Sequence, residues 1–331
     1  MNILELPVAG LGLIIVRQQL MRIYYFYRQI ARFLIMAALL ASLTGCGAIR
    51  RSAMKSVADT LASPDSDVFT RDEDLELVGA AAPFGLKLYE SLLDSIPDHV
   101  PLLIATCSQF TQYSYGFVQS KAEELEYMDY TEYTHQKDRA LRMYLRAREY
   151  CLRGLDKRFP KVRVALLRDP KAALARAKKQ DVPLLYWSAA SWGGALAIGI
   201  GRPDLAGDLH VVRGLAERAL ELDPDYANGA THELMISLDS LDEVVGGSED
   251  RAREHFKRAV ELQKNKPQAG PYVSLATGIA LKKQNREEFE RLLNEALAID
   301  PDKHPEVRLP NLAAQRRAKY FLNQVDELFP K

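Results

Sequence analysis

The sequence predicts an all-α protein: a tetratricopeptide-like array of helical hairpins, or α-solenoid, behind an N-terminal lipoprotein signal peptide. Three observations lead to this prediction. A short apolar leader ends at a cysteine, good helix formers dominate from residue 72 onward, and several helices end at a proline that follows regularly spaced apolar positions. We expect a signal peptide at residues 1–45, a lipidated tether at 46–70 and a helical domain at 71–331.

The leader has the parts of a bacterial secretory signal. Three arginines between residues 22 and 32 make its first part positive, an apolar run follows, and Leu-Thr-Gly-Cys closes it at residues 43–46. This ending matches the bacterial lipobox, in which the cysteine is acylated and the preceding peptide is removed. A transmembrane helix is the alternative, but the apolar run is about half of the roughly 20 residues that a span needs. We therefore expect lipidation of Cys46.

Two further details concern export. Met21 places a signal of standard length before Cys46, so a start at Met21 and a longer leader from Met1 are both open. Gly47 follows the cysteine in place of an aspartate, which favours the outer membrane by a sorting rule that varies among bacteria. The expected location is the periplasm, with a lipid anchor in a membrane.

The charge balance argues against a nucleic-acid partner. The full chain has 44 basic and 44 acidic side chains, and removing residues 1–45 leaves 40 basic and 43 acidic ones. A nucleic-acid-binding surface needs a clear excess of positive charge on one face. The mature protein, with a net charge of about −3, therefore gives no sign of one.

The second helices of the hairpins are the clearest elements of the predicted domain. Proline lacks an N–H group and stops a helix, as expected at Pro97, Pro224 and Pro301. Small and large apolar residues recur at helical spacing where two helices of a hairpin would touch. These positions are Gly85, Tyr89 and Leu92; Ala147, Cys151 and Gly154; Val212, Ala216 and Ala219; Ala252, Phe256 and Ala259; and Phe289, Leu293 and Ala296.

The spacing of the hairpins is irregular. Ala219, Ala259 and Ala296 are 40 and 37 residues apart, longer than the 34-residue tetratricopeptide period, so extended helices or turns are expected. Residues 184–200 form a first helix with a turn at 201–204, and the 65 residues from Gly154 to Ala219 leave room for an irregular hairpin plus an insertion. An irregular helical bundle with chance spacing is the alternative.

Two cysteines lie in the predicted domain. Leu103, Cys107 and Phe110 share one face of a first helix, and Cys151 takes the facing position of the second helix. A disulfide requires Cα atoms within about 7 Å. Packed helices lie about 8 to 10 Å apart between axes, and buried free thiols are common. We therefore expect no disulfide, although export to an oxidising compartment permits one.

Motifs for catalysis and metal binding are missing. His232-Glu233 lacks the second histidine of a zinc-protease helix, and the chain has neither a Cys-x-x-Cys pair nor a Gly-x-Ser-x-Gly turn. We expect a protein that is not an enzyme and needs no cofactor or metal.

Aromatic and small residues suggest a route for a ligand. Seven of the 15 tyrosines lie between residues 113 and 150, and the helix at 184–200 combines aromatic with small side chains. Ordinary helix packing explains both features equally simply, whereas the functional interpretation is a passage with aromatic walls. Its expected lining residues are Tyr113, Phe117, Tyr186, Trp187, Trp192, Gly193 and Gly194.

Several segments resemble one known family. They are Pro-Phe-Gly-Leu-Lys-Leu at 83–88, Leu-Tyr-Trp-Ser-Ala-Ala-Ser-Trp at 185–192, Arg-Ala-Leu-Glu-Leu-Asp at 218–223, Val-Gly-Gly at 245–247, His-Phe-Lys-Arg-Ala at 255–259, Arg-Arg-Ala at 316–318 and Asp-Glu-Leu-Phe at 326–329. The mature chain, from about residue 72 to residue 329, resembles the T component of tripartite ATP-independent periplasmic (TRAP) transporters.

The resemblance implies a binding component. Members of the family are periplasmic lipoproteins that are thought to oligomerise, with a trimer expected, and to engage the soluble substrate-binding P component. The ligand that it implies is a small organic acid, with a hydrophobic one as a candidate. The alternative function is a tetratricopeptide scaffold lipoprotein in outer-membrane or cell-envelope assembly. A scaffold would present an open concave face, whereas an adaptor would enclose an apolar pore.

Overall fold

The computed structural model describes residues 8–63, 68–199, 202, 205 and 207–330, without the side chains of residues 8–16, 18 and 37–49. These residues form α-, 3-10 and π-helices and no β-strand, which confirms the predicted all-α fold. The chain divides into two compact units, residues 1–56 and residues 57–331, which are described separately below.

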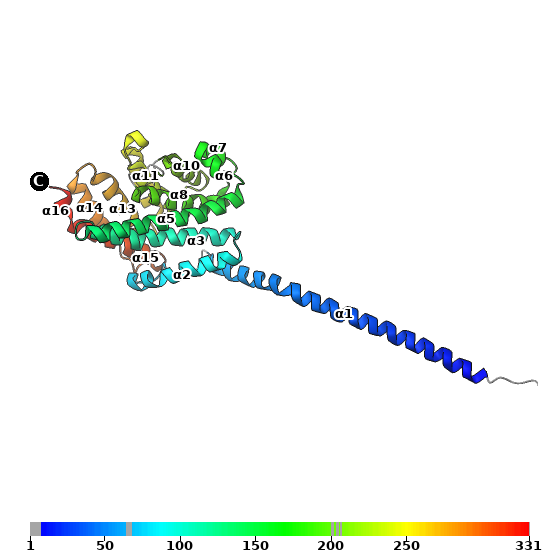
Figure 1. Cartoon of the computed structure of the whole chain (residues 1–331). Helices are drawn as coiled ribbons and strands as arrows, with labels where there is room; N and C mark the ends of the chain where they lie inside the picture. Colours follow the sequence, from blue (N-terminus) through cyan, green and yellow to red (C-terminus); the bar gives the residue numbers. More distant parts are fainter. Residues whose placement is uncertain (1–7, 64–67, 200–201, 203–204, 206, 331) are drawn as a thin grey trace, which may run out of the picture. The chain divides into compact units, whose positions relative to one another are not determined.

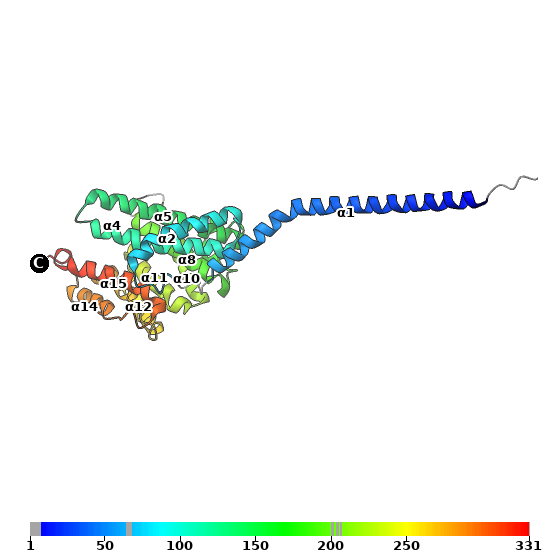
Figure 2. The same cartoon turned by 90° about the horizontal axis from the view of Figure 1, so that it is seen from below.

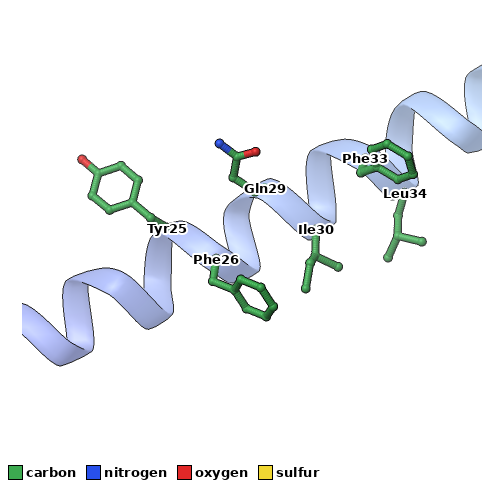
Figure 3. Close-up of a pocket in the computed structure, with 6 residues that line it drawn as sticks. All are labelled: Tyr25, Phe26, Gln29, Ile30, Phe33 and Leu34. Carbon is green, nitrogen blue, oxygen red and sulfur yellow. The ribbon is translucent and has the colours of Figure 1, made fainter.

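The first unit consists of helix α1 (Val8–Leu61), whose last turns belong to the second unit. The helix includes Cys46 and continues through most of the expected tether. Figure 3 shows six side chains around a hollow on its surface: Tyr25, Phe26, Gln29, Ile30, Phe33 and Leu34. All six come from α1, so the hollow is bounded by one helix and gives no basis for a binding site. In the described part of the chain, no helix combines the length and apolarity needed to cross a membrane.

The second unit begins with long helices packed side by side. Helix α2 (Leu75–Ser95) packs on α3 (Val100–Tyr113), and α3 packs on α5 (Tyr130–Arg158) (Figure 1). The Asp74 carboxylate accepts hydrogen bonds from two backbone amides of the first turn of α2, and Asp129 caps α5 in the same way. As predicted, α2 ends just before Pro97.

A π-helical turn interrupts the connection between α3 and α5. This turn, η1 (Ser114–Gln119), leads into α4 (Ser120–Leu125). Such turns disturb the regular backbone bonding and occur frequently at functional sites. Ser120 Oγ donates to the carbonyl of Tyr115 at 3.1 Å, and Arg316 Nη2 donates to that of Gly116 at 2.8 Å. A side chain from near the C-terminus therefore helps to complete the turn.

The middle of the unit contains an insertion and one regular hairpin. Short helices α6 (Val162–Arg168), α7 (Pro170–Ala173) and η2 (Lys179–Asp181) form the insertion, and α8 (Val182–Ile198) packs on α10 (Leu209–Leu222). The region between Gly154 and Ala219 thus holds a hairpin and an insertion, as expected, although the hairpin is regular. Apart from Arg202, the turn expected at 201–204 lies outside the described residues.

The last third of the unit continues the array with shorter helices. Its elements are η3 (Tyr226–Asn228), α11 (Ala230–Asp239), η4 (Glu243–Val245), α12 (Glu249–Leu262), α13 (Gly270–Leu275), the π-helical η5 (Ala276–Ala280), α14 (Arg286–Leu297), η6 (Pro305–Val307), α15 (Arg308–Asn323) and α16 (Val325–Leu328). Helix α11 packs on α12, and α14 packs on both α13 and α15. Pro224 and Pro301 follow the ends of α10 and α14, as predicted.

Most of the predicted helix contacts are buried in two core clusters, one ending at α11 and one covering α11 to α16. The predicted positions with at most 6% exposure are Leu92, Ala147, Cys151, Val212, Ala216, Ala219, Ala252, Ala259, Phe289, Leu293 and Ala296. A Cβ on Gly154 would lie 3.0 Å from Leu184, which confirms a close helix contact there. Gly85 is an exception, because a Cβ at that position would meet nothing within 4 Å.

The expectation that Cys107 and Cys151 remain free thiols is wrong. The structure joins them in a disulfide with Cα atoms 5.5 Å apart. Both residues are fully buried where α3 crosses α5. The expectation compared the wrong distances: Cα atoms lie about 2.3 Å from their helix axis, so facing Cα atoms on helices with the ordinary axis spacing of about 8 to 10 Å come within reach of a disulfide.

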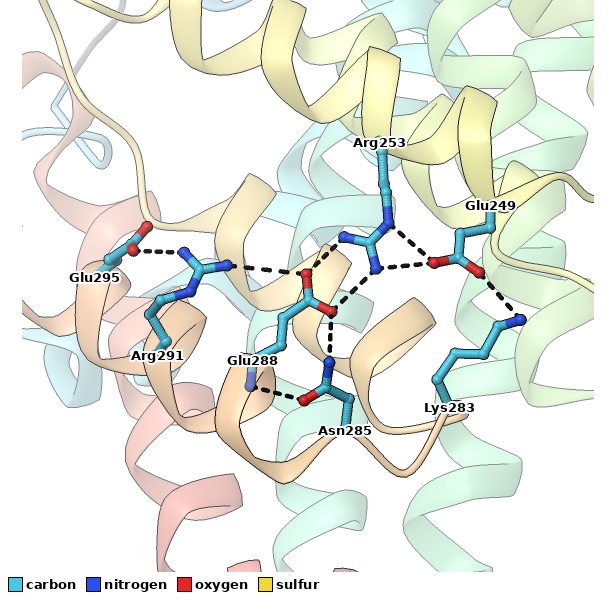
Figure 4. A network of polar contacts seen from close by, with 7 residues as sticks. All are labelled: Glu249, Arg253, Lys283, Asn285, Glu288, Arg291 and Glu295. Carbon is cyan, nitrogen blue, oxygen red and sulfur yellow. Dashed lines mark hydrogen bonds and ion pairs between the residues drawn. The ribbon is translucent and has the colours of Figure 1, made fainter.

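A charged network joins two successive second helices, α12 and α14. Figure 4 shows Arg253 of α12 between Glu249 of its own helix and Glu288 of α14. Arg253 Nη1 and Nη2 donate to the two oxygens of Glu288 at 2.5 and 3.0 Å, and Lys283 pairs with Glu249 at 3.0 Å. The hydrogen bond from Arg253 lowers the pKa of the Glu288 carboxyl. The network links the α12 and α14 helices through charged contacts in addition to their apolar packing.

The two ends of the helical array contact each other within the second unit. Helix α15 contacts α2 and η1, which lie about 200 residues earlier in the chain (Figures 1 and 2). The backbone N–H of Leu309 donates to the carbonyl of Thr70 at 2.9 Å, and Arg308 Nη1 donates to that of Arg71 at 3.1 Å. The last long helix therefore faces the first hairpins, and side chains from both ends of the array meet inside it.

Candidate ligand-binding site

Arg317 joins the two ends of the array at its interior. From α15 it donates through Nε and Nη2 to the two oxygens of Glu123 on α4, at 2.8 and 3.0 Å. It also donates to the hydroxyl of Tyr115 in η1, and its guanidinium lies 5.0 Å from the centre of that ring. Two-pronged pairing of this kind fixes an arginine in one geometry. The positive charge of Arg317 is therefore matched by Glu123.

Tyr115 is the most accessible member of this group. Its side chain retains 40% exposure, yet desolvation raises its pKa, and the charges of Arg317, Glu233 and Glu123 act on it as well. Tyr144 of α5 lies next to it, donates to Gln119 Oε1 at 2.7 Å, and has a pKa well above the usual value because of burial.

Glu233 on α11 is the unpaired acid of the group. Burial raises the pKa of its carboxyl to about 7, and the charge of Arg317 offsets only part of this effect. The carboxylate lies directly against the first residue of α13, since a Cβ on Gly270 would be 2.2 Å from Glu233 Oε1. Among the described residues, no side chain donates a hydrogen bond that lowers this pKa. Glu233 is nevertheless partly accessible.

Tyr186 on α8 completes the group, and Trp187 holds it in place. Burial raises the pKa of Tyr186, and the charges of Glu233 and Tyr115 also act on it. Its ring packs edge-on against Trp187 at 4.9 Å and tilts against Tyr226 at 5.3 Å. Burial raises the pKa of Tyr226 to about 12, although a hydrogen bond with Trp187 lowers it in part. We define the interior cluster as Tyr115, Glu123, Tyr144, Tyr186, Glu233 and Arg317.

Trp192 does not join the interior cluster, although it lies on the same helix as Tyr186. It is 4% exposed, and its Nε1 donates to Asp208 Oδ2 at 3.1 Å. The guanidinium of Arg148 lies 4.9 Å from its ring. The structure therefore corrects the expectation that Trp192 lines a passage, because packing and two polar contacts bury its ring.

The two glycines next to Trp192 serve close packing. A Cβ on Gly194 would be 2.4 Å from Cε1 of Tyr144, and one on Gly193 would be 3.3 Å from Val212 of α10. The expectation that Gly194 leaves open space is therefore corrected, since the Tyr144 ring occupies that space. Gly193 likewise allows α8 to approach α10.

Tyr113 directly precedes the π-helical turn η1, and Phe117 lies within it. Their rings stack with centres 5.5 Å apart, and Arg139 Nη2 donates to the Tyr113 hydroxyl at 3.4 Å. Phe117 lies against Gly79 of α2, where a Cβ would be 2.8 Å from its ring. Tyr113 is 8% exposed, and the two rings pack η1 against the hydrophobic core. Tyr113 and Phe117, the predicted lining residues, are thus sequence neighbours of Tyr115, which is the residue that contacts Arg317.

His232, which precedes Glu233 on α11, forms a pair with His255 of α12. His232 Nδ1 and His255 Nδ1 are 2.8 Å apart, so one ring must donate to the other. His255 Nε2 lies 3.6 Å from the buried Asp239, whose Oδ1 accepts from Arg213 at 2.8 Å and Arg251 at 2.9 Å. Burial lowers the pKa of His232 to about 4, with the neighbouring His255 adding to the effect. In the part of the chain that the structure describes, no three potential metal ligands gather.

The two arginines on Asp239 also border a surface groove of about 620 Å³. Gly246 and Val245 close one side of it, and Gly246 adopts a left-handed conformation with φ of 89°. Arg251 Nη2 donates to the Gly246 carbonyl, which fixes this turn. The arginines are thus bound to Asp239 and to backbone carbonyls. Their presence at the groove is explained by these contacts, which stabilise the fold.

The expected lipidation residue, Cys46, falls within helix α1, and its side chain lies outside the description.

Comparison with known proteins identifies the family. The sequence matches the TRAP transporter T-component family over residues 71–329, which includes every member of the interior cluster. The chain belongs to this family. An uncharacterized protein of Treponema pallidum (strain Nichols) is 29% identical over 309 residues, covering 86% of this chain and 93% of that protein. The family is an accessory component of a transporter and not a class of enzymes.

The T-component match agrees with the resemblance found in the sequence, and two of the quoted segments carry members of the interior cluster. Arg317 lies in the Arg-Arg-Ala segment, and Tyr186 lies in the Leu-Tyr-Trp segment. In the sequence, Glu233 stands out only as part of an incomplete zinc motif. Its role as an unpaired interior acid depends on Gly270 and Arg317, which are distant in sequence.

Proposed function

We propose that this T component is a lipid-anchored periplasmic protein that binds the substrate-binding P component of a TRAP transporter and passes a small organic ligand to it. Family membership over residues 71–329 is the observation that carries this proposal. The lipobox at residues 43–46 supports anchoring through Cys46, and Gly47 after it favours the outer membrane. The family suggests a protein that acts by binding, without catalysis, and that forms a homo-oligomer such as a trimer.

The interior cluster supports the passage of a ligand. Tyr115, Tyr186 and Glu233 retain accessible surface while side chains from α4, α5 and α15 surround them. Ligand sites in proteins typically combine aromatic walls with a few polar groups that fix orientation. The cluster has this composition, and it lies where the two ends of the array meet.

Capture of the P component tests the partner. The full chain would be co-expressed with a TRAP substrate-binding protein from the same genome, lightly crosslinked and purified, with a binding protein of another transporter class as the control. We expect the TRAP protein to be enriched and the control to be absent. Equal recovery of both, or of neither, would favour the scaffold function in cell-envelope assembly. Light scattering of the purified protein would give the oligomeric state.

A further inference from the structure

The turns of helix α1 that follow Cys46 are basic. Arg50, Arg51 and Lys55 lie there, and no acidic residue occurs between Cys46 and Asp59. All three basic side chains are exposed. Arg51 and Lys55 are four positions apart, so they are neighbours on one face of the helix. We call Arg50, Arg51 and Lys55 the basic segment.

The protein does not neutralise the basic segment. No ion pair or hydrogen bond joins its three side chains to other residues that the structure describes. Asp59, the first acid after it, pairs with His99 at 2.8 Å. In the helical domain, by contrast, arginines such as Arg163 and Arg286 each pair with two carboxylates. The basic segment therefore presents three positive charges to its surroundings.

The rest of the mature chain has the opposite charge. Without the basic segment, residues 46–331 contain 37 basic and 43 acidic side chains, a net charge of about −6. An anionic surface therefore attracts the basic segment and repels the remainder of the chain. This difference rules out net charge as the source of any affinity for such a surface, and it leaves the position of the basic segment as the cause.

The basic segment also lies close to the predicted site of lipidation. Helix α1 rises about 1.5 Å per residue, so Arg50 and Arg51 are about 6 and 8 Å from Cys46 along its axis. Charges within about 8 Å of each other are only partly screened at physiological ionic strength. A lipid on Cys46 would thus hold both guanidinium groups within electrostatic reach of the membrane surface.

We propose that the basic segment binds the headgroup phosphates of anionic phospholipids in the membrane that holds the lipid anchor. This inference rests on the proposed function for the anchor on Cys46. Guanidinium groups donate two parallel hydrogen bonds to a phosphate, and each basic residue near an anionic membrane strengthens its binding several-fold. The lipid and the basic segment together fix the first turns of the mature chain at the membrane surface.

Vesicle binding of residues 47–331, without the lipid, tests the inference. Residues 57–331 form a compact unit with their own apolar cores, so this chain folds without the anchor. It would be sedimented with vesicles of phosphatidylcholine alone or mixed two to one with phosphatidylglycerol. Three basic contacts imply a partition coefficient about a hundredfold higher for the anionic vesicles at low salt. High salt should remove most of this preference. Equal binding to both vesicles would overturn the inference.

A triple variant assigns the preference to the basic segment. Arg50→Gln with Arg51→Gln and Lys55→Gln should bind both kinds of vesicle equally weakly, because it removes all three contacts. The matched control removes the same charges from exposed positions of the helical domain, by Arg142→Gln with Lys171→Gln and Arg176→Gln. An unchanged preference in the triple variant, or an equal loss in the control, would refute the role of the basic segment.

The outcome can be told apart from that of the proposed function. Failure to capture the P component with the wild-type chain would remove the transporter role, whereas vesicle binding is measured without that partner and without the lipid. Loss of P-component capture in the triple variant, with vesicle binding unchanged, would assign the basic segment to a protein partner and refute the lipid inference.

Discussion

Arg317 and Glu123 form a two-pronged ion pair between residues 194 positions apart, with Nε–Oε2 and Nη2–Oε1 distances of 2.8 and 3.0 Å. Their side chains are 12% and 22% exposed. The pair connects α15 to α4 beside the π-helical turn, so it holds the C-terminal helix against the first hairpins. The charge of Arg317, which already pairs with Glu123, offsets only part of the rise that burial causes in the pKa of Glu233.

Removal of Arg317 should destabilise the protein strongly. Arg317→Met leaves the largely buried Glu123 without its partner, which typically costs about 3 kcal/mol of unfolding free energy. Urea unfolding measures the change. The matched control is Arg258→Met, because Arg258 is 40% exposed where it pairs with Asp225 and Glu261, and such pairs contribute less than about 1 kcal/mol. Equal losses of unfolding free energy in the two variants would show that the Arg317–Glu123 pair contributes no more to stability than an exposed pair.

The disulfide between Cys107 and Cys151 should contribute to stability. It links residues 44 positions apart, and closing a loop of this length removes unfolded-state entropy worth about 4 kcal/mol in the chain-entropy model. We expect Cys107→Ser with Cys151→Ser to lower the melting temperature. In the Cys46→Ser background, thiol titration of denatured, unreduced protein should find no reactive group, whereas two reactive groups would show that the bond does not form.

Gly194 should tolerate no side chain. A methyl group there would meet the buried Tyr144 ring at 2.4 Å, and overpacking of this kind costs about 1 to 3 kcal/mol. Gly85→Ala is the matched control, since it adds a methyl group to a helix position with nothing within 4 Å. That control should stabilise the helix by about 0.5 to 1 kcal/mol. The melting temperatures of both variants test this prediction. An unchanged melting temperature for Gly194→Ala would mean that the Tyr144 ring moves aside without cost.

The His232–His255 pair should make stability depend on pH. Burial lowers the pKa of His232 to about 4 in the folded protein, whereas an unfolded histidine has a pKa of about 6.5. Between these values the unfolded chain binds more protons, so this contribution is present above about pH 6.5 and is lost as the pH falls towards 4. His232→Asn should flatten the fall in unfolding free energy over this range. Equal slopes for wild type and His232→Asn would contradict the assignment.

Cys46 should carry the lipid. Labelled palmitate supplied to cells should enter the wild-type chain and not Cys46→Ser, because the thiol is the group that the lipobox presents for acylation. The variant should also appear in the soluble periplasmic fraction. Equal labelling of both chains would remove the lipobox from the proposal.

The sequence by itself determined the fold class, the family and most helix contacts of this protein. Local chemistry is sufficient for these features: α2 ends just before Pro97, and Ala216 and Ala219 mark a buried stripe through their spacing alone. The repeat pattern also indicated that α3 and α5 face each other at Cys107 and Cys151. It could not give the distance between them, because the approach of two helices depends on every side chain in the contact.

Only the tertiary structure decided which side chains meet in the interior. Trp192 and Gly194 look like passage residues on a single helix, but Asp208 and Tyr144 arrive from other elements and fill their surroundings. Arg317 meets Glu123 and Tyr115 only because α15 returns to the start of the array. Electrostatic contacts depend on distance in space and on desolvation, and neither quantity is encoded in the spacing of residues along one helix.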